Sequence, residues 1–498
     1  MFENVLGQSA SLQLIEDIKA GYLAQAMLFQ GPPASGKGTA ALELGRVISC
    51  ESGGGAQKIS GPAAWACQCH ACSRHRLLLH PDLLCLGPRS FSAEITASSK
   101  TFLREAASQG NPVSIESKAG PGCMLFLRSV RKLLLRFNPV LWEDEPKGSK
   151  IFPLVNSLED SLDELGSPEA DAVREQGALF KLVEGILKDS YKLESEGMAE
   201  LIPIGQLRRA ASWSHLAPAG RGKILILENA DRMQEEARNS LLKILEEPPP
   251  SLYCVLTSFR PGSMLPTILS RLRPYRFNSR DAEVEREVIR RVFRTEIGPE
   301  EPSPAEPGST KPSSSEANSM ELASASISLY LDSFLPVSGA VLEGLAAFFT
   351  ASVAYKAVLI SKKQGRPLPQ AAVMLGKYSA PKAEEAGLGR PTGEPGALVA
   401  AISEKANNFE IRSLFSRFLS KVLEQVSGSQ RYCAAEGSSG PSFFLPGPGY
   451  NEMWKKCVNW AGLAVLTYKL RPAQVLEKMF ADLGQYCSNA SGRGMADL

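Results

Sequence analysis

The fold of this chain is decided by one stretch, Gly31-Pro32-Pro33-Ala34-Ser35-Gly36-Lys37-Gly38-Thr39. An apolar run of strand type, residues 26–29, precedes it, and a helical pattern follows from Ala40. In such a glycine-rich turn the backbone N–H groups point inward at the start of a helix, where the helix dipole favours phosphate. Lys37 would neutralise the terminal phosphate oxygens. The stretch therefore predicts a strand, loop and helix that bind a nucleoside triphosphate.

The same loop departs from the usual pattern for Mg2+. That pattern ends in Gly-Lys followed by Ser or Thr, whose hydroxyl holds the ion. Here Gly38 follows the lysine, and the hydroxyl comes one residue later, at Thr39. An ordinary glycine turn between a strand and a helix is the alternative. The residues predicted to hold ATP, with Mg2+ as the expected ion, are Gly31, Pro32, Ser35, Gly36, Lys37, Gly38 and Thr39.

Length and composition indicate a multidomain protein. The chain has 498 residues, too many for one hydrophobic core, and about 150 residues per domain predicts roughly three domains. Its formal net charge of +2 gives no global argument for nucleic-acid binding. The first residues form no signal segment, and no apolar run reaches the roughly 18 residues of a membrane span. We therefore expect a cytoplasmic protein that contacts no membrane.

Four cysteines near the end of the predicted loop helix indicate a metal site. Three of them lie within six positions, which is unlike a secreted disulfide framework. Thiolates at this spacing can turn onto one Zn2+ ion and form a tetrahedral S4 set. His70 or His75 could replace one thiolate, and reduced free thiols on a loop are the alternative. The predicted zinc ligands are Cys50, Cys67, Cys69 and Cys72.

An acid follows a second buried strand. The four apolar residues 224–227 precede Glu228, so the carboxylate should lie at the carboxyl end of a parallel strand beside the nucleotide loop. Glu228 is therefore predicted to hold metal-bound water. Asn229 stands where an ATPase of this type needs a second acid, and an amide cannot act as a base. The alternative is that Glu228 only ends a core strand.

A third strand ends in hydroxyl groups. Residues 252–258 are of strand type and follow a helix stopped by prolines. A polar residue at the carboxyl end of such a strand can sense a γ-phosphate, and Ser258 or Thr257 is placed for this role. We predict Ser258 as the sensor.

Two segments interrupt the regular pattern. Residues 87–199 are predicted to be an insertion; within it, residues 126–137 form a basic amphipathic helix. This helix could touch a DNA backbone, although such a pattern is more often a surface helix packed by its apolar face. Residues 297–322 are rich in Pro, Ser and Glu and predict a disordered insert.

Several strings of residues together carry a family resemblance. They are Asn4-Val5-Leu6-Gly7-Gln8, the nucleotide loop, Cys50 with the cysteine cluster, His80-Pro81-Asp82, Ala237-Arg238-Asn239-Ser240-Leu241-Leu242-Lys243-Ile244-Leu245-Glu246-Glu247-Pro248-Pro249 and Leu265-Pro266-Thr267-Ile268-Leu269-Ser270-Arg271. In these strings the chain resembles the gamma/tau and delta-prime family of bacterial DNA polymerase III clamp-loader subunits, which are AAA+ proteins. The resemblance covers about residues 1 to 86 and 200 to 278.

The resemblance implies an α/β fold with a parallel sheet, followed by helical domains. The implied parts are an AAA+ nucleotide-binding domain at 1–278, with a zinc module at about 50–75 and the insertion at about 87–199, a helical lid at 279–375, and an all-helical C-terminal collar at 376–498. The resemblance also implies that Arg271 is an arginine finger. Its guanidinium would reach the ATP of a neighbouring subunit and stabilise charge on the transferring phosphate.

Departures from the family pattern indicate the delta-prime type. Gly38 replaces the Mg2+ hydroxyl, Asn229 replaces an acid, and Ala66 stands where the second zinc cysteine would fall, leaving Cys67 as the shifted candidate. We identify no clear Gly-x-x-Arg sensor after residue 330, and the basic, Pro-containing segment that precedes the Gly-Gln motif in gamma/tau is lacking. We therefore expect a subunit that binds ATP, hydrolyses it weakly or not at all, and supplies Arg271.

As a delta-prime-like subunit the chain would join other clamp-loader subunits in a hetero-oligomeric ring. That ring would load the sliding clamp onto primed DNA, which this chain would contact through the assembled complex. We identify no polymerase carboxylate set, so a DNA-directed DNA polymerase (nucleotidyltransferase) activity would belong to the holoenzyme.

Three alternatives stay open. The first is a gamma/tau-type ATPase motor of the same complex. The second is a P-loop nucleotide kinase, because Gly36-Lys37-Gly38-Thr39 resembles the loop of nucleoside monophosphate kinases. A kinase of that class needs a cluster of lid arginines, which we cannot locate. The third is a structural AAA+ module with an empty pocket.

Overall fold

The computed structural model describes most of the chain. The described residues are 1–53, 63–108, 120–166, 176–199, 201–294, 326–335, 337, 339–388, 411–436, 448–466 and 470–489. The predicted disordered insert at 297–322 lies outside them. The chain forms two compact units, Met1–Phe334 and Leu335–Leu498, which are described separately below.

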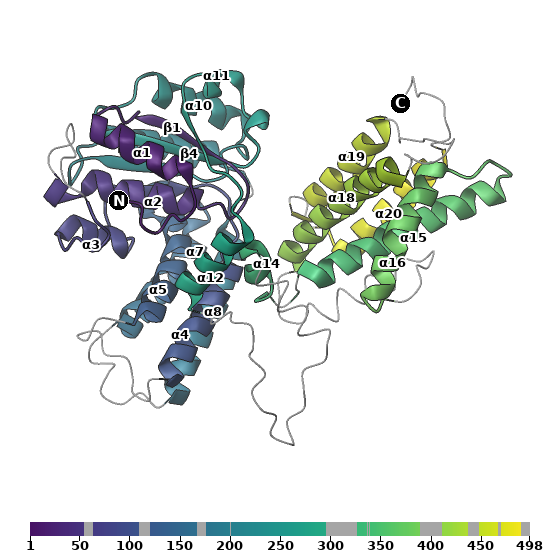
Figure 1. The fold of residues 1–498 in the computed structure, drawn as a ribbon, viewed down its shortest axis with the longest axis horizontal. Coiled ribbons are helices and arrows are strands. Elements are labelled where there is room, and N and C mark those ends of the chain that lie inside the picture. The colour runs from purple at the N-terminus through teal and green to yellow at the C-terminus, as the bar shows by residue number, and fades with distance from the viewer. Residues whose placement is uncertain are drawn as a thin grey trace. The chain divides into compact units, whose positions relative to one another are not determined.

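A five-stranded parallel sheet forms the centre of the first unit (Figure 1). Its strands are β1 (Ala26–Gln30), β2 (Leu83–Leu86), β3 (Lys223–Leu227), β4 (Leu252–Ser258) and β5 (Arg273–Arg276), in the spatial order β2-β3-β4-β1-β5. Every neighbouring pair is parallel, with Gln30 opposite Ser258 and Leu86 opposite Leu227. The α/β class with a parallel sheet is thus confirmed, and all carboxyl ends of the strands meet at one edge.

The sheet is buried on both faces, as the apolar runs in the sequence require. Successive residues of β1 point to opposite faces, so Met27 and Phe29 join one core while Leu28 joins another. The helices of this unit outside the insertion are α1 (Ser9–Ala20), α2 (Lys37–Ser49), α3 (His70–Arg76), α9 (Ile204–His215), α10 (Glu235–Glu246), α11 (Pro266–Leu269), α12 (Ala282–Phe293) and α14 (Ile327–Asp332). The helix predicted from Ala40 is α2, which starts three residues earlier, at Lys37, within the nucleotide loop.

The insertion at 87–199 is helical where it is described. It contains α4 (Ser92–Ser108), α5 (Pro121–Leu134), the 3-10 turn η2 (Leu135–Phe137), α6 (Pro139–Trp142), α7 (Gly148–Gly166) and α8 (Gln176–Gly197), and α4, α5, α7 and α8 gather together in Figure 1. Its apolar side chains belong to the same core as Leu28 and Leu225 of the sheet. The insertion is therefore an integral part of this unit.

The basic helix predicted at 126–137 corresponds to α5 with η2, and its cations are used inside the protein. Arg128 donates to the carbonyl of Arg76, and Arg131 donates to that of Leu77. Lys132 pairs with Glu94, and Arg136 with Glu228. Because its apolar face is buried and its cations have internal partners, this helix offers no free basic stripe to DNA.

The second unit is helical where it is described. It contains α15 (Gly339–Lys363), α16 (Gln370–Glu385), α18 (Ile411–Glu436), α19 (Pro448–Leu466) and α20 (Pro472–Asn489), which share one apolar core. The lid expected at 279–375 would include α15 and α16, whereas these helices pack with the C-terminal helices. The reason is that the apolar side chains of α15, including Phe349 and Val353, are buried against those helices.

Helix α15 bears on the expectation about membrane spans. Among the described helices, it alone is long and apolar enough to cross a membrane. However, 72% of its most apolar window is buried inside the protein. Its apolarity is explained by its place in the core of the second unit.

Candidate functional site

The nucleotide loop, residues 31–39, has the backbone of a phosphate-binding turn. Gly31 and Gly36 have φ values of 154° and 94°, which favour glycine. A Cβ atom at Gly31 would lie 2.1 Å from the carbonyl oxygen of Phe277, the residue that follows β5. The backbone of the loop therefore passes so close to this residue that only glycine fits. The loop thus passes from the end of β1 into α2 with its free N–H groups at the helix start.

Lys37 contacts the loop itself. Its Nζ atom donates to the carbonyl oxygens of Gly31 and Pro32 at 2.8 and 2.5 Å. Burial lowers the pKa of Lys37 to about 8, against the opposing effects of Glu228 and Asp231. The ammonium group would therefore have to exchange these carbonyl oxygens for phosphate oxygens when a nucleotide binds.

Glu228 lies directly after β3, as predicted, but its carboxylate is bound by two arginines. Arg89 Nη1 is 3.3 Å from Oε1, and Arg136 donates to Oε2. Burial alone would raise the pKa of Glu228, but Arg89 and Arg136 outweigh it and lower that pKa. Both carboxylate oxygens thus have cationic partners, and sequence reasoning missed both arginines.

The loop does not fit Mg2+ in the usual way. A Cβ atom added at Gly38 would lie 2.5 Å from Glu228 Oε1 and 3.5 Å from Arg89 Nη1. The carboxylate and its arginine therefore stand where the magnesium-binding hydroxyl of this motif would be. Thr39, which carries the nearest hydroxyl in the sequence, has an exposed side chain.

Asn229 has a structural role beside the acid. Its φ is 52°, a left-handed conformation that asparagine adopts more readily than most residues. Its Nδ2 atom donates to the carbonyl of Pro88 at 2.7 Å, and its backbone N–H donates to Thr257 Oγ1 at 3.1 Å. The amide thus fastens the start of the insertion to the end of β3.

The predicted sensor lies at the expected edge of the sheet. Ser258 is fully buried at the end of β4, opposite Gln30 at the end of β1. Its hydroxyl donates to Asp231 Oδ1 at 2.7 Å and accepts from the backbone N–H of Arg260 at 3.0 Å. Asp231 is a second acid near Lys37 to which sequence reasoning gave no role.

Arg280 is a further cation that the sequence motifs did not indicate. Its Nη1 atom donates to the carbonyl of Ala34 at 2.6 Å, and its Nε atom donates to that of Leu6 at 2.9 Å. A Cβ atom at Gly36 would lie 2.6 Å from its Nη2 atom. Arg280 thus lies directly against the nucleotide loop, although 244 positions separate it from Gly36 in the sequence.

Arg271 lies just after α11, with 36% of its side chain exposed. Its Nη1 atom donates to the carbonyl of Thr267 at 2.7 Å, and its Nη2 atom lies 2.8 Å from Glu246 Oε1. The side chain of Glu246 is 48% exposed. In these contacts the partners of the guanidinium are the nearby carbonyl of Thr267 and the surface acid Glu246.

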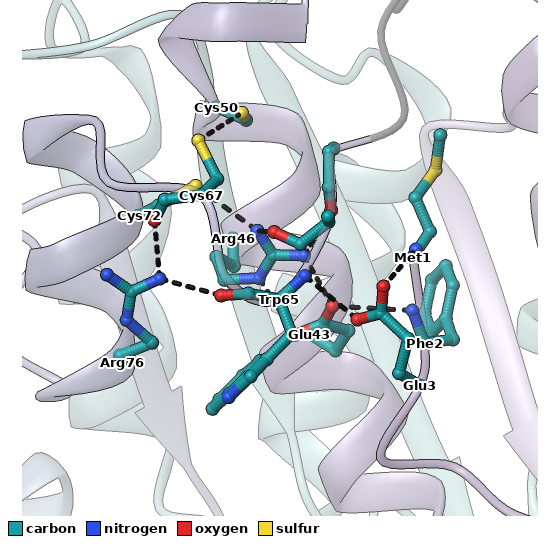
Figure 2. A network of polar contacts seen from close by, with 12 residues as sticks. Met1, Phe2, Glu3, Glu43, Arg46, Cys50, Trp65, Cys67, Cys72 and Arg76 are labelled. Atoms are coloured by element: carbon teal, nitrogen blue, oxygen red, sulfur yellow. Dashed lines mark hydrogen bonds and ion pairs between the residues drawn. The ribbon is translucent and has the colours of Figure 1, made fainter.

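The four predicted zinc ligands come together. The sulfur atoms of Cys50, Cys67, Cys69 and Cys72 all lie within 4.8 Å of one another. Cys50 and Cys67 are 3.8 Å apart, sulfur to sulfur (Figure 2). A tetrahedral site with Zn–S distances of about 2.3 Å has sulfur–sulfur edges of about 3.8 Å, so the cluster fits Zn2+.

The histidines near the cluster do not complete it. Among the described residues, the group able to hold a metal contains neither His70 nor His75. His75 shares a 2.9 Å hydrogen bond with Ser49 and stacks on His80 at 4.2 Å. Burial lowers the pKa of His75 to about 2, so the ring is neutral.

Arg46 links the cysteine cluster to the helix of the nucleotide loop (Figure 2). This fully buried side chain of α2 pairs with Glu43 and donates to Cys72 Sγ at 3.2 Å. It also donates to the carbonyls of Ala63 and Ala64. Arg46 would therefore connect a metal bound at the cysteine cluster to helix α2.

Comparison with known proteins gives partial matches. Residues 174–281 match the family described as "DNA polymerase III, delta subunit". DNA polymerase III subunit delta' of Pseudomonas aeruginosa is 37% identical over 103 residues, 20% of this chain and 31% of the relative. The same subunit of Buchnera aphidicola is 42% identical over 55 residues, 11% of this chain and 16% of the relative. The matches thus span less than a third of these relatives.

A solved structure is also similar. It is a DNA polymerase III gamma subunit-related protein from Thermotoga maritima, 18% identical in sequence, with a TM-score of 0.25. The aligned region covers 58% of this chain and 81% of the Thermotoga maritima chain. The family match at 174–281 contains Glu228, Ser258 and Arg271. The family match and the two delta' relatives confirm the resemblance that the sequence motifs indicated.

Proposed function

We propose that this chain, as a relative of the DNA polymerase III clamp-loader subunits, is a delta-prime-like subunit that lends Arg271 to a neighbour and hydrolyses little or no ATP itself. The observation that carries the proposal is the state of Glu228. Both oxygens of this carboxylate are bound, by Arg89 and by Arg136. An acid held in this way cannot also hold metal-bound water, and Asn229 cannot replace it as a base.

Arg271 is suited to act on another chain. Its ion pair with Glu246 is exposed on both sides, and exposed pairs contribute only about 0–1 kcal/mol. Exchanging Glu246 for a phosphate of a neighbouring subunit would therefore cost little. A guanidinium at the transferring phosphate stabilises the charge that develops there, an effect of about 1,000-fold or more on turnover in comparable sites.

The remaining parts of the proposal concern ligands and partners. The nucleotide loop would bind ATP through its backbone N–H groups and Lys37, and the four cysteines would hold one Zn2+ ion. The chain would assemble with other clamp-loader subunits into a ring that opens the sliding clamp and places it on primed DNA. The relatives' names and the motifs around Arg271 support this assignment.

The test is the ATPase rate of the reconstituted loader with clamp and primed DNA. Arg271→Ala should lower that rate by about tenfold or more, because one developing charge loses its partner. Arg273→Ala is the matched control, since Arg273 lies two positions after Arg271, is 45% exposed and pairs with Asp17. It should leave the rate within about twofold.

Two results would contradict the proposal. An unchanged rate in the Arg271→Ala loader would remove the arginine-finger role. Vigorous ATP turnover by the purified chain alone, dependent on Lys37 and Glu228, would instead identify a gamma/tau-type motor.

A further inference from the structure

We propose that the nucleotide loop binds the polyphosphate of a nucleotide without a divalent cation, with the guanidinium group of Arg89 taking the place of Mg2+. The inference rests on the proposed function for its premise that ATP binds at this loop. It adds which cation neutralises the phosphates, and it assigns Arg89 as a ligand-binding residue.

The space beside Gly38 is already filled. The ion pair of Glu228 with Arg89 lies on Gly38, the first-turn residue whose side chain would normally help to hold the metal. Any side chain at that position would collide with the carboxylate, since a Cβ atom would be 2.5 Å from Oε1. The ion pair therefore occupies the space that a hydroxyl-bearing side chain at position 38 would need.

The charges around Arg89 favour an anion over a metal cation. Arg89 also binds Glu94 at 2.5 Å, and Lys132 pairs with the same acid. With Arg136 on Glu228, three cations thus face these two carboxylates, and Glu194 adds a third acid near Arg89. Lys37 also lies nearby, together with Asp231 and Arg280, so that five cations stand against four carboxylates. A divalent cation would have to displace a guanidinium and enter a site that already carries excess positive charge. A polyanion, in contrast, would be attracted.

The two arginines bound to Glu228 differ in exposure. Both guanidinium groups lie over the Phe91 ring, at 5.2 Å for Arg89 and 5.4 Å for Arg136. Arg136 is the more buried of the two: its side chain is 5% exposed, and its backbone carbonyl accepts a hydrogen bond from Trp142. Arg89 has a side chain that is 30% exposed. Arg89 can therefore turn toward a ligand, while Arg136 keeps Glu228 neutralised.

The backbone around Arg89 positions it for this role. Gly87 has a φ of 111°, and a Cβ atom there would lie 2.0 Å from the carbonyl oxygen of Glu228. Asn229 fastens the next residue, Pro88. The start of the insertion is thus fixed against the end of β3, which brings Arg89 to the nucleotide loop. A guanidinium is always charged and can donate two parallel hydrogen bonds to a phosphate.

The experiment is calorimetric titration of the full chain with ATP, with and without added Mg2+. Divalent ions are removed from the buffer with a resin before the protein is added. EDTA is avoided because it would also extract a metal from the cysteine cluster. We expect the dissociation constants in the two buffers to agree within about threefold, because Arg89 supplies the charge that the metal supplies elsewhere. A tenfold or greater loss of affinity without Mg2+ overturns the inference.

Variants give an independent test. Arg89→Gln should weaken metal-free binding by about tenfold, the size expected for losing a charged hydrogen-bonding partner, and should make added Mg2+ strengthen binding. Arg89→Lys keeps the charge and guards against a folding defect; it should lose less affinity than Arg89→Gln. Arg290→Ala is the control, since this exposed arginine pairs within α12. Unchanged metal-free binding in Arg89→Gln overturns the inference.

The outcomes separate the two proposals. ATP binding that requires Mg2+ overturns this inference and leaves nucleotide binding by the chain intact. Absence of ATP binding in both buffers overturns the nucleotide-binding part of the proposed function and this inference with it. Neither result affects the role of Arg271.

Discussion

Replacing Arg46 with alanine should strongly destabilise the first unit. Arg46 is 1% exposed, and its guanidinium makes five hydrogen bonds. Two of them bind both oxygens of Glu43, which is itself buried (Figure 2). Truncation would leave that carboxylate without its cation, and removing one partner of a buried pair costs about 3–5 kcal/mol. We therefore expect the free energy of unfolding to fall by about this amount.

The structure also predicts how the loss can be reversed. The backbone N–H of Phe2 still donates to Glu43 at 3.3 Å, but one neutral donor cannot balance a buried charge. Replacing both partners, as in the double variant Glu43→Leu with Arg46→Met, removes the charge itself. The free energy of unfolding of that double variant should be about 2 kcal/mol or more above that of Arg46→Ala. The reason is that replacing both members of a buried ion pair by apolar residues often leaves stability unchanged.

The assay must report on one unit, because a chain with two units need not unfold in one step. Hydrogen exchange in rising urea, followed by mass spectrometry on peptides from α2 and β1, gives the unfolding free energy of the first unit. Arg74→Ala is the matched control, since this arginine donates to the carbonyl of Leu79 in an exposed position. Its effect should be below about 0.5 kcal/mol. A loss below about 1 kcal/mol in Arg46→Ala, or an equally unstable double variant, would refute the reasoning.

Three further predictions follow from the charged and metal-binding groups. Burial would raise the pKa of Glu94, but Lys132 and Arg89 lower it from 4.5 to about 2. The contribution of the Glu94 carboxylate to stability is therefore complete above about pH 4.5 and is lost as the pH falls toward 2. Glu94→Gln should flatten this acid dependence in urea titrations by up to about 1.4 kcal/mol per pH unit; an unaltered slope would contradict it. The purified chain should contain about one zinc per molecule by elemental analysis, lost in Cys72→Ser and kept in the distant Cys457→Ser. Gly38→Thr restores the usual loop sequence, but the new side chain would collide with Glu228. The variant should therefore lose about 1–3 kcal/mol of stability in thermal unfolding and show no ATP turnover. A gain in turnover would show that the Glu228 carboxylate is free.

The sequence predicted those parts of the site that depend on neighbouring residues. The glycines and Lys37 lie within nine positions, and the turn they form follows from local backbone freedom and the start of a helix. Glu228 and Ser258 could be placed because each follows an apolar run, and parallel strands end at the same edge of a sheet. Three of the four clustered cysteines were evident from their crowding.

The tertiary structure alone decided what these groups can do. Arg89 and Arg136 are 139 and 92 positions from Glu228, so no local pattern could assign them to it. The basic residues of α5 looked like a surface stripe, because sequence periodicity does not say which side chains find acids and carbonyls elsewhere. Apolar spacing determines which face of an element is buried, since that is a local property. Charge pairing depends on distances in space, and only the folded chain fixes those.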